Sequence, residues 1–196
     1  KAETLFSNTQ PLRVSITATA NNNFFISYID QDNTGKFVIY DNTGTLVKAV
    51  TTFNATSIDW VSCCITSNDN IFISFVDNSG ARELDFVVYD NTGTISVAKT
   101  QVYVGNAASP QCSAVSDQVM IVYFNQDLGV AGEAAFTIYD DAGNLEKAET
   151  SFYADIAYPS VSGSSNNFFI SYFDFATSVG SYIIYDSAGT LVKSAT

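Results

Sequence analysis

The chain repeats one phrase four times, and this repetition constrains its fold more than any other feature. A Tyr-Asp pair followed by D-x-x-G spacing recurs at intervals of 46 to 50 residues, beginning at Tyr40, Tyr89, Tyr139 and Tyr185. Upstream of each pair lies an aromatic and β-branched run, read as NFFISYID, NIFISFVD, QVMIVYFN and NFFISYFD. A weaker third phrase precedes that run at Val14-Ser15, Val61-Ser62, Cys112-Ser113 and Val161-Ser162. Three phrases in one order, four times over, indicate an internal repeat of one structural unit.

Each unit predicts four short antiparallel strands. The Val-Ser phrase lies in the first strand, the aromatic run is the second, the Tyr-Asp pair ends the third, and the fourth follows a tight turn. Aspartate can bond the backbone two residues on, and glycine accepts the positive φ that such a turn needs. No segment has a capped 3.6-residue period, so we expect no helix. The residues predicted to form these structural turns are Asp41, Gly44, Asp90, Gly93, Asp140, Gly143, Asp186 and Gly189.

A four-stranded antiparallel unit of about 48 residues is similar to a propeller blade. In this architecture the chain resembles β-propeller repeat proteins, although it has no Trp-Asp signature, no Kelch double glycine and no complete Asp-box. The resemblance implies an all-β, propeller-type fold of four blades in a single repeat domain, residues 1–196. Its expected units are a leading strand at 1–11 and blades at 12–58, 59–109, 110–158 and 159–196.

The two ends of the chain carry the same kind of strand. KAETLF at residues 1–6 matches KAETSF at 147–152, and Lys1–Thr4 resembles Lys193–Thr196, so the terminal strand is duplicated. Three arrangements are open: a longer parent chain, self-association of chains into a larger ring or filament, and a four-bladed ring closed by Leu5-Phe6. The expected partners are therefore a longer parent chain or further copies of the chain itself.

The charge balance excludes several classes of protein. The chain has 8 Lys and Arg against 20 Asp and Glu, a net charge of −12, and no His. Binding nucleic acid needs a basic surface that displaces phosphate counterions, so no nucleic-acid partner is expected. The absence of His removes imidazole metal sites and Ser-His or Cys-His nucleophiles. No apolar run is long enough for membrane insertion, and the low content of Lys and Arg favours a secreted or cell-surface protein.

The loops that follow the second strands vary in length and share one face with the loops between blades. Loops on a rigid scaffold commonly carry binding residues. Carboxylates there accept hydroxyl hydrogen bonds, and the single Trp offers a stacking surface for a possible glycan. The candidate ligand-binding residues are Trp60, Asp30, Asp32, Asp77, Asp174, Glu83 and Glu133. Asp30 and Asp32 in DQDNTG faintly resemble a calcium loop, so Ca²⁺ is possible, although we otherwise expect no cofactor and assign no metal ligands.

The repeat pattern predicts a protein that is not an enzyme. Two carboxylates can hydrolyse a glycoside without His, but the aspartate that ends the second strand recurs in three of four units, as a structural residue would. Glu83 and Glu133 are the non-repeated carboxylates considered for catalysis. The sequence therefore predicts a non-enzymatic extracellular repeat protein acting in structure, adhesion or self-assembly as a surface layer, fibre or array. The alternative is a carbohydrate-binding, lectin-like propeller that uses the variable loop face.

Overall fold

The computed structural model describes residues 5–126 and 132–194, and every regular element in these ranges is a β-strand. The all-β prediction is therefore confirmed. None of the described residues form a helix that is long and apolar enough to cross a membrane.

Four antiparallel sheets of four strands each follow one another along the chain, and we number them blades 1 to 4. Blade 1 consists of β1 (Arg13–Ala18), β2 (Phe24–Ile29), β3 (Gly35–Tyr40) and β4 (Leu46–Asn54). Blade 2 consists of β5 (Ile58–Ile65), β6 (Ile71–Asp77), β7 (Glu83–Tyr89) and β8 (Ile95–Tyr103). Blade 3 consists of β9 (Ala107–Val115), β10 (Gln118–Asn125), β11 (Glu133–Asp140) and β12 (Leu145–Ala154). Blade 4 consists of β13 (Ile156–Ser164), β14 (Asn167–Asp174), β15 (Val179–Asp186) and β16 (Leu191–Lys193).

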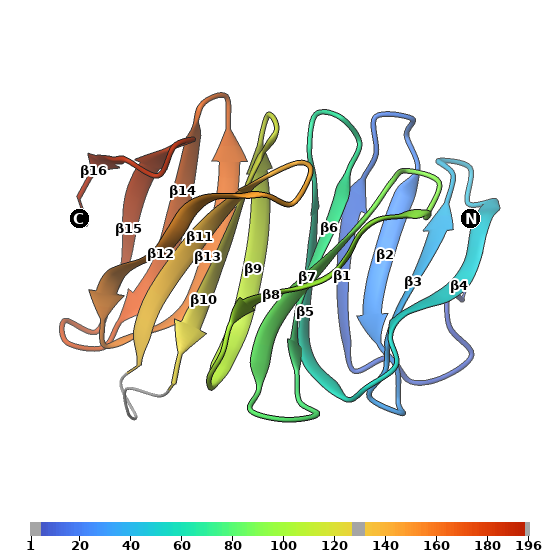
Figure 1. The fold of residues 1–196 in the computed structure, drawn as a ribbon, viewed down its shortest axis with the longest axis horizontal. Coiled ribbons are helices and arrows are strands. Elements are labelled where there is room, and N and C mark those ends of the chain that lie inside the picture. Colours follow the sequence, from blue (N-terminus) through green and yellow to red (C-terminus); the bar gives the residue numbers. More distant parts are fainter. Residues whose placement is uncertain (1–4, 127–131, 195–196) are drawn as a thin grey trace.

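The blades stand in a row rather than in a closed ring (Figure 1). The first strands β1, β5, β9 and β13 contact one another in succession, and blades 1 and 4 occupy opposite ends of the row. Closure of four blades by Leu5-Phe6 is therefore not observed. The expected leading strand also differs, because residues 5–12 form no strand, while its residues 1–4 lie outside the described residues.

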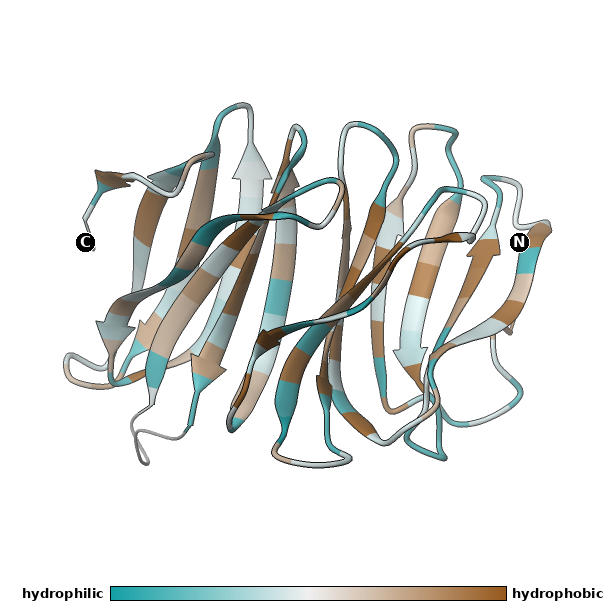
Figure 2. Cartoon of the chain, in the orientation of Figure 1, coloured by the Kyte–Doolittle hydropathy of each residue, from teal (hydrophilic) through white to brown (hydrophobic). Residues whose placement is uncertain are grey.

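The core is divided among the three junctions between neighbouring blades. Strand residues alternate in direction, so each central blade buries one set of apolar side chains against the blade before it and the other set against the blade after it. Figure 2 shows hydrophobic segments recurring along the strands of all four blades. Each junction contains the same aromatic contact, with ring centroids 4.7 Å apart: Phe37 with Tyr89, Phe86 with Tyr139, and Phe136 with Tyr185.

The turn between the third and fourth strands has the same geometry in each blade. In blade 1, Oδ1 of Asp41 accepts hydrogen bonds from the backbone N–H groups of Thr43 and Thr45, both at 2.8 Å, and Gly44 has φ of +84°. The three later turns repeat the carboxylate-to-backbone bonds and the positive φ of the glycine. These aspartates hold the hairpins that extend from the third strands.

The first strands of blades 2, 3 and 4 each contain a β-bulge near their beginning, where the pairing with the second strand shifts by one residue. The weak Val-Ser phrase does not align across the blades as the sequence suggested, because its register differs between the first two blades and the last two. Val61 pairs with Phe75, whereas Cys112 pairs with Ile121, which lies two positions earlier in its second strand. Cys112 pairs with Ile121 as Cys63 pairs with Ile73, so the two cysteines occupy one structural position. The bulges lie on the loop face, where they shape the candidate site.

Candidate functional site

A cavity of about 320 Å³ opens on the loop face where blades 2, 3 and 4 meet. Side chains from the first strands β5, β9 and β13 form one part of its wall, and residues at or after the ends of the second strands form the rest. The residues that line it are Asp59, Trp60, Arg82, Ala108, Ser109, Phe124, Gln126, Ala157, Tyr158 and Phe175. Three blades therefore contribute to a single pocket that combines charged and aromatic side chains.

The bulges place equivalent residues of three blades at this pocket. Counting from the residue paired with the end of each second strand, Trp60, Ser109 and Tyr158 occupy one position. Ser109 and Tyr158 have positive φ values of 49° and 54°, which non-glycine residues adopt only where the surrounding structure imposes them. Bulges commonly re-aim a side chain beside a functional site.

An ion pair spans the pocket wall of blade 2. Nη2 of Arg82 donates to Oδ2 of Asp59 at 2.8 Å, and Nη1 donates to Oε1 of Gln126 in blade 3 at 3.3 Å. The Arg82 and Asp59 side chains are both partly open to solvent. Nε of Arg82 is buried and has no hydrogen-bond partner among the described residues. The arginine thus fixes a solvent-accessible carboxylate and retains one donor.

The aromatic residues of the pocket differ in what they offer a ligand. Tyr158 is 78% exposed and Phe175 is 53% exposed, so both rings present apolar surface to solvent. Trp60 is only partly exposed, and the guanidinium of Arg13 lies 3.4 Å from its ring centroid. A cation over one face of the indole leaves that face closed to stacking. Tyr158 and Phe175 are therefore the better stacking surfaces.

The aspartates that end the second strands lie outside this pocket. Asp30 is buried and forms an ion pair with Lys36, which together with the Thr9 hydroxyl lowers the pKa of the Asp30 carboxyl. Asp174 is also buried and accepts hydrogen bonds from the Tyr153 hydroxyl at 3.1 Å and the Ala176 N–H at 2.8 Å.

The third of these aspartates, Asp77, lies in a similar environment. Asp77 is buried, forms an ion pair with Lys99 and accepts a hydrogen bond from the Thr56 hydroxyl at 2.9 Å. All three carboxylates are thus engaged by protein donors in the described structure, and Asp174 accepts one of its hydrogen bonds from Tyr153 of the preceding blade.

The remaining predicted carboxylates are also separate from the cavity. Asp32 is exposed and bonds to the backbone N–H of Thr34 at 3.0 Å, with Lys36 Nζ at 3.5 Å. Glu83 and Glu133 begin the third strands of blades 2 and 3, opposite Asp77 and Asn125. Of the seven candidate ligand-binding residues, Trp60 alone lines the cavity. Within the described ranges, no three acidic or cysteine side chains are grouped as metal ligands.

Sequence reasoning missed Asp59, Arg82, Tyr158 and Phe175. One usable signal was that Asp59 breaks the repeat, because β9 and β13 have Ala108 and Ala157 at the same pairing position. The differing register of the Val-Ser phrase hid this signal, since an alignment on that phrase places Pro110 and Pro159 opposite Asp59. The exposure of Tyr158 follows from the local backbone and has no counterpart in the residue pattern.

Comparisons with known proteins show similarity at the level of the fold. No family model and no curated protein matches the chain. Among solved structures, an α-L-arabinofuranosidase from Clostridium thermocellum matches 95% of this chain and 72% of its own, with TM-score 0.61 and 10% identity. A Hadza microbial sialidase matches 90% of this chain and 44% of its own, with TM-score 0.63 and 8% identity. An ulvan lyase of polysaccharide lyase family 25 matches 88% and 55%, with TM-score 0.57 and 8% identity.

These similarities confirm the propeller-type architecture, since the neighbours include β-propeller proteins of glycoside hydrolase family 43. The chain spans less than two thirds of the length of the sialidase and the lyase. The prediction of a non-enzymatic function in structure, adhesion or self-assembly is contradicted, because the neighbours include proteins named as glycosidases and a polysaccharide lyase. The separate prediction that copies of the chain are partners of one another stays a prediction. The recurrence of the second-strand aspartates had argued against catalysis, but those residues lie away from the pocket.

Proposed function

We propose that this chain takes part in carbohydrate processing, with a saccharide bound in the cavity between blades 2, 3 and 4. The observation that carries the proposal is the Asp59–Arg82 pair at 2.8 Å, which lines the same cavity as the exposed rings of Tyr158 and Phe175. Carbohydrate-processing enzymes among the structural neighbours support the same assignment.

The lining residues match the chemistry of a sugar. A pyranose or furanose ring has apolar C–H faces, which pack against the exposed aromatic rings of Tyr158 and Phe175. Its hydroxyls donate to the Asp59 carboxylate and the Gln126 carbonyl and accept from Arg82. A few convergent polar groups in an otherwise apolar concavity are typical of small-molecule sites.

Asp59 is the residue to which we assign the proton transfer. As a general base, its carboxylate takes a proton from water while the water oxygen attacks the anomeric carbon. The bond to the leaving oxygen breaks, and that oxygen takes a proton from solvent. Arg82 holds the carboxylate in place during this step. A nitrophenyl leaving group departs as a stable phenolate without protonation, so aryl glycosides isolate the contribution of Asp59 from that of an acid.

The test is a panel of nitrophenyl glycosides, including α-L-arabinofuranosides and sialosides, together with a uronate-containing polysaccharide followed by absorbance of an elimination product. Asp59→Asn should lower turnover of the accepted substrate by about 100-fold or more. Tyr158→Ala should raise KM with a smaller effect on kcat. Asp32→Asn, which removes an exposed carboxylate of the same face outside the cavity, is the matched control and should change neither. Equal turnover by wild type and Asp59→Asn would refute the assignment.

We further propose that the protein works outside the cell or at its surface. The low content of Lys and Arg, the acidic charge and the proposed carbohydrate substrate support this location. Immunodetection in fractionated cultures of the native source would test it, and recovery confined to the cytosolic fraction would contradict it.

A further inference from the structure

The two end blades expose apolar surfaces that every central blade buries. On the side of blade 1 that faces away from blade 2, Phe24 is 41% exposed, whereas Ile71, Val119 and Phe168 at the same repeat position are fully buried. On the opposite side of blade 4, Phe169 is 40% exposed, whereas its counterparts are fully buried: Phe25, Phe72 and Met120. Each end of the row therefore exposes a surface of the kind that is buried in the junctions between neighbouring blades.

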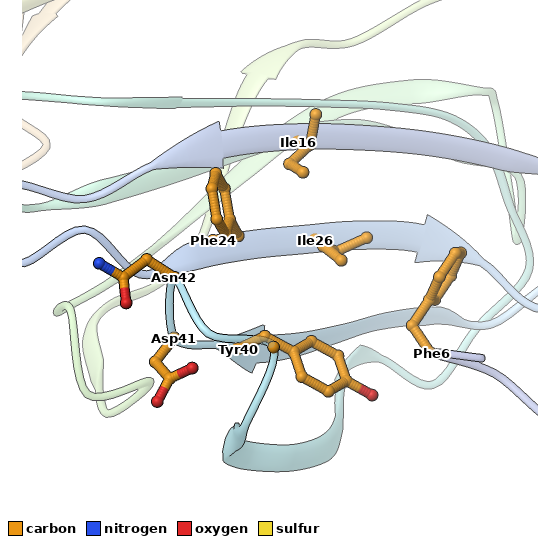
Figure 3. Close-up of a pocket in the computed structure, with 8 residues that line it drawn as sticks. Phe6, Ile16, Phe24, Ile26, Tyr40, Asp41 and Asn42 are labelled. Atoms are coloured by element: carbon orange, nitrogen blue, oxygen red, sulfur yellow. The ribbon is translucent and has the colours of Figure 1, made fainter. Parts of the chain in front are cut away.

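A cavity marks the blade 1 face. It has a volume of about 380 Å³ and is lined mainly by Phe6, Ile16, Phe24, Ile26 and Tyr40, together with the turn residues Asp41, Asn42 and Gly44 (Figure 3). In blade 2, the side chains at the corresponding positions are covered by blade 1 side chains and belong to the buried core. They include Cys63, Ile71, Ile73 and Tyr89. Repeat proteins need a polar outer face on their terminal units, and blade 1 lacks one.

The exposed face of blade 4 resembles the face of blade 1 that packs against blade 2. Phe169 and Tyr182 stack with centroids 4.8 Å apart and planes at 18°, as Phe25 and Phe37 of blade 1 stack at 4.6 Å and 19°. In blade 1, that aromatic pair is the surface on which blade 2 sits. Blade 4 thus presents a preformed surface of the same kind to solvent.

Charge is complementary across the same contact. Between blades 1 and 2, the Gly93 turn packs beside Phe37 and the Lys48 side chain. Between blades 3 and 4, the Gly189 turn packs beside Phe136 and the Lys147 side chain. In blade 4, Lys193 is the equivalent of Lys48 and Lys147, and in blade 1 the turn with Asp41 is the equivalent of the Gly93 and Gly189 turns. A basic residue of the blade 4 face would therefore lie beside an acidic turn of the blade 1 face.

The segment before β1 lies where a preceding blade would end. Phe6 contacts Tyr28 with centroids 5.4 Å apart. In the internal junctions, Phe53 at the end of β4 contacts Phe75 of the next blade at 5.3 Å, and Phe152 near the end of β12 contacts Tyr172 at 6.0 Å. Phe6 therefore occupies part of the contact that the last strand of a preceding blade makes.

We propose that a second copy of this chain docks end to end, so that the blade 4 face of one copy covers the blade 1 face of the next. The contact would repeat the three internal junctions, with Tyr40 of one copy set against the Phe169–Tyr182 pair of the other. A contact between two different faces is heterologous, so it produces either a closed ring of blades or an open chain.

Sedimentation velocity over a range of concentrations tests the proposal. The mass should rise above the 21.1 kDa of one chain, and Ile16→Arg on the blade 1 face or Phe169→Arg on the blade 4 face should each return it to one chain. Mixing these two variants should restore a complex of two chains, because each retains the face that the other has lost. Ile95→Arg, at an exposed position on the outer strand of blade 2, is the control and should associate as wild type does.

Three results would overturn the proposal. One is a mass of one chain at every concentration. Another is association that persists in either single variant, since both faces are needed for a head-to-tail contact. The third is a failure of the mixture to form a two-chain complex when circular dichroism shows both variants to be folded as wild type. None of these results bears on saccharide turnover, which the Asp59 variant tests separately.

Discussion

Nζ of Lys99 lies 3.1 Å from Oδ2 of Asp85, a carboxylate with no exposed surface. Lys99 also pairs with the buried Asp77, so one ammonium group serves two carboxylates inside blade 2. Lysines elsewhere in the repeat lie opposite the third strand at Lys48, Lys147 and Lys193, whereas blade 2 has Val97 there. The displacement of Lys99 by two residues is explained by Asp85, because the other blades have no carboxylate at that position. The residues there are Lys36, Ala135 and Ser181.

Replacing Lys99 with Met should destabilise the protein by about 2 kcal/mol or more, because two buried carboxylates lose their cation. Chemical unfolding followed by fluorescence measures this loss. Lys147→Met is the control, because it removes a lysine from the matching strand of blade 3 where no ion pair is observed among the described residues, and it should shift the midpoint little. Equal midpoints for the two variants would show that Lys99 does not hold the buried charges.

The folded protein should lose stability in acid. The pKa of Asp30 is lowered by the Lys36 hydrogen bond, and that of Asp41 by hydrogen bonds from Thr43 and Thr45. A pKa lowered by folding gives stability that is present above the usual value of 3.8 and is lost as the pH falls through the folded value. Urea midpoints measured from neutral pH to below 3.8 should therefore fall. Asp41→Asn keeps a turn acceptor that does not titrate, so its midpoint should fall less steeply than that of wild type.

Two glycine substitutions should separate backbone strain from packing between blades. Gly44 and Gly93 have φ of +84° and +77°, so alanine is strained at both, at a cost of about 1 kcal/mol. A Cβ at Gly93 would also lie 3.1 Å from the Phe37 ring, whereas one at Gly44 meets no atom within 4 Å. Gly93→Ala should therefore lower the midpoint of thermal unfolding more than Gly44→Ala does, when both variants are measured at a protein concentration at which the chain is a single copy. Equal losses would mean that the turn does not pack tightly on the preceding blade.

The three cysteines should be unreactive in the folded protein. Cys63, Cys64 and Cys112 are free and buried, and burial raises the pKa of Cys63 to about 11. The thiolate is the reactive form, so both access and ionisation oppose modification. Ellman's reagent should report almost no thiol in native buffer and all three in denaturant. Rapid labelling without denaturant would indicate that the first strands open readily.

The four-stranded blades could be predicted from the sequence because residues close together in the chain specify each blade. The D-x-x-G turns and the alternating second strands specify each blade from a short stretch of chain, as Asp41 with Gly44 and Phe24 with Phe25 show. The open row could not be predicted, because closure depends on the angle between blades, which no residue pattern encodes. The same limit applied to the site. Asp59, Arg82 and Tyr158 lie in separate segments of the sequence and line one pocket only in the folded chain.

The aspartates predicted as ligands show why composition alone misplaced the site. A carboxylate in a loop of an acidic protein looks available, yet Asp30 and Asp174 are engaged by side chains from other strands. Their partners Lys36 and Tyr153 are identified only by the folded register. The non-repeated residue Asp59 was the informative one, because a residue that departs from the repeat is not required by the repeated scaffold.

The most direct test of the account is to map saccharide binding by NMR on the isotope-labelled protein. An arabinofuranoside, a sialoside and a uronate-containing oligosaccharide would each be titrated, with the Trp60 indole, the Arg82 side chain and the backbone of Tyr158 as reporters. The account predicts that at least one of these saccharides shifts all three signals saturably, and that Asp59→Asn weakens the response. Saturable shifts confined to other surfaces, or no shift at these residues with any of the three, would contradict it.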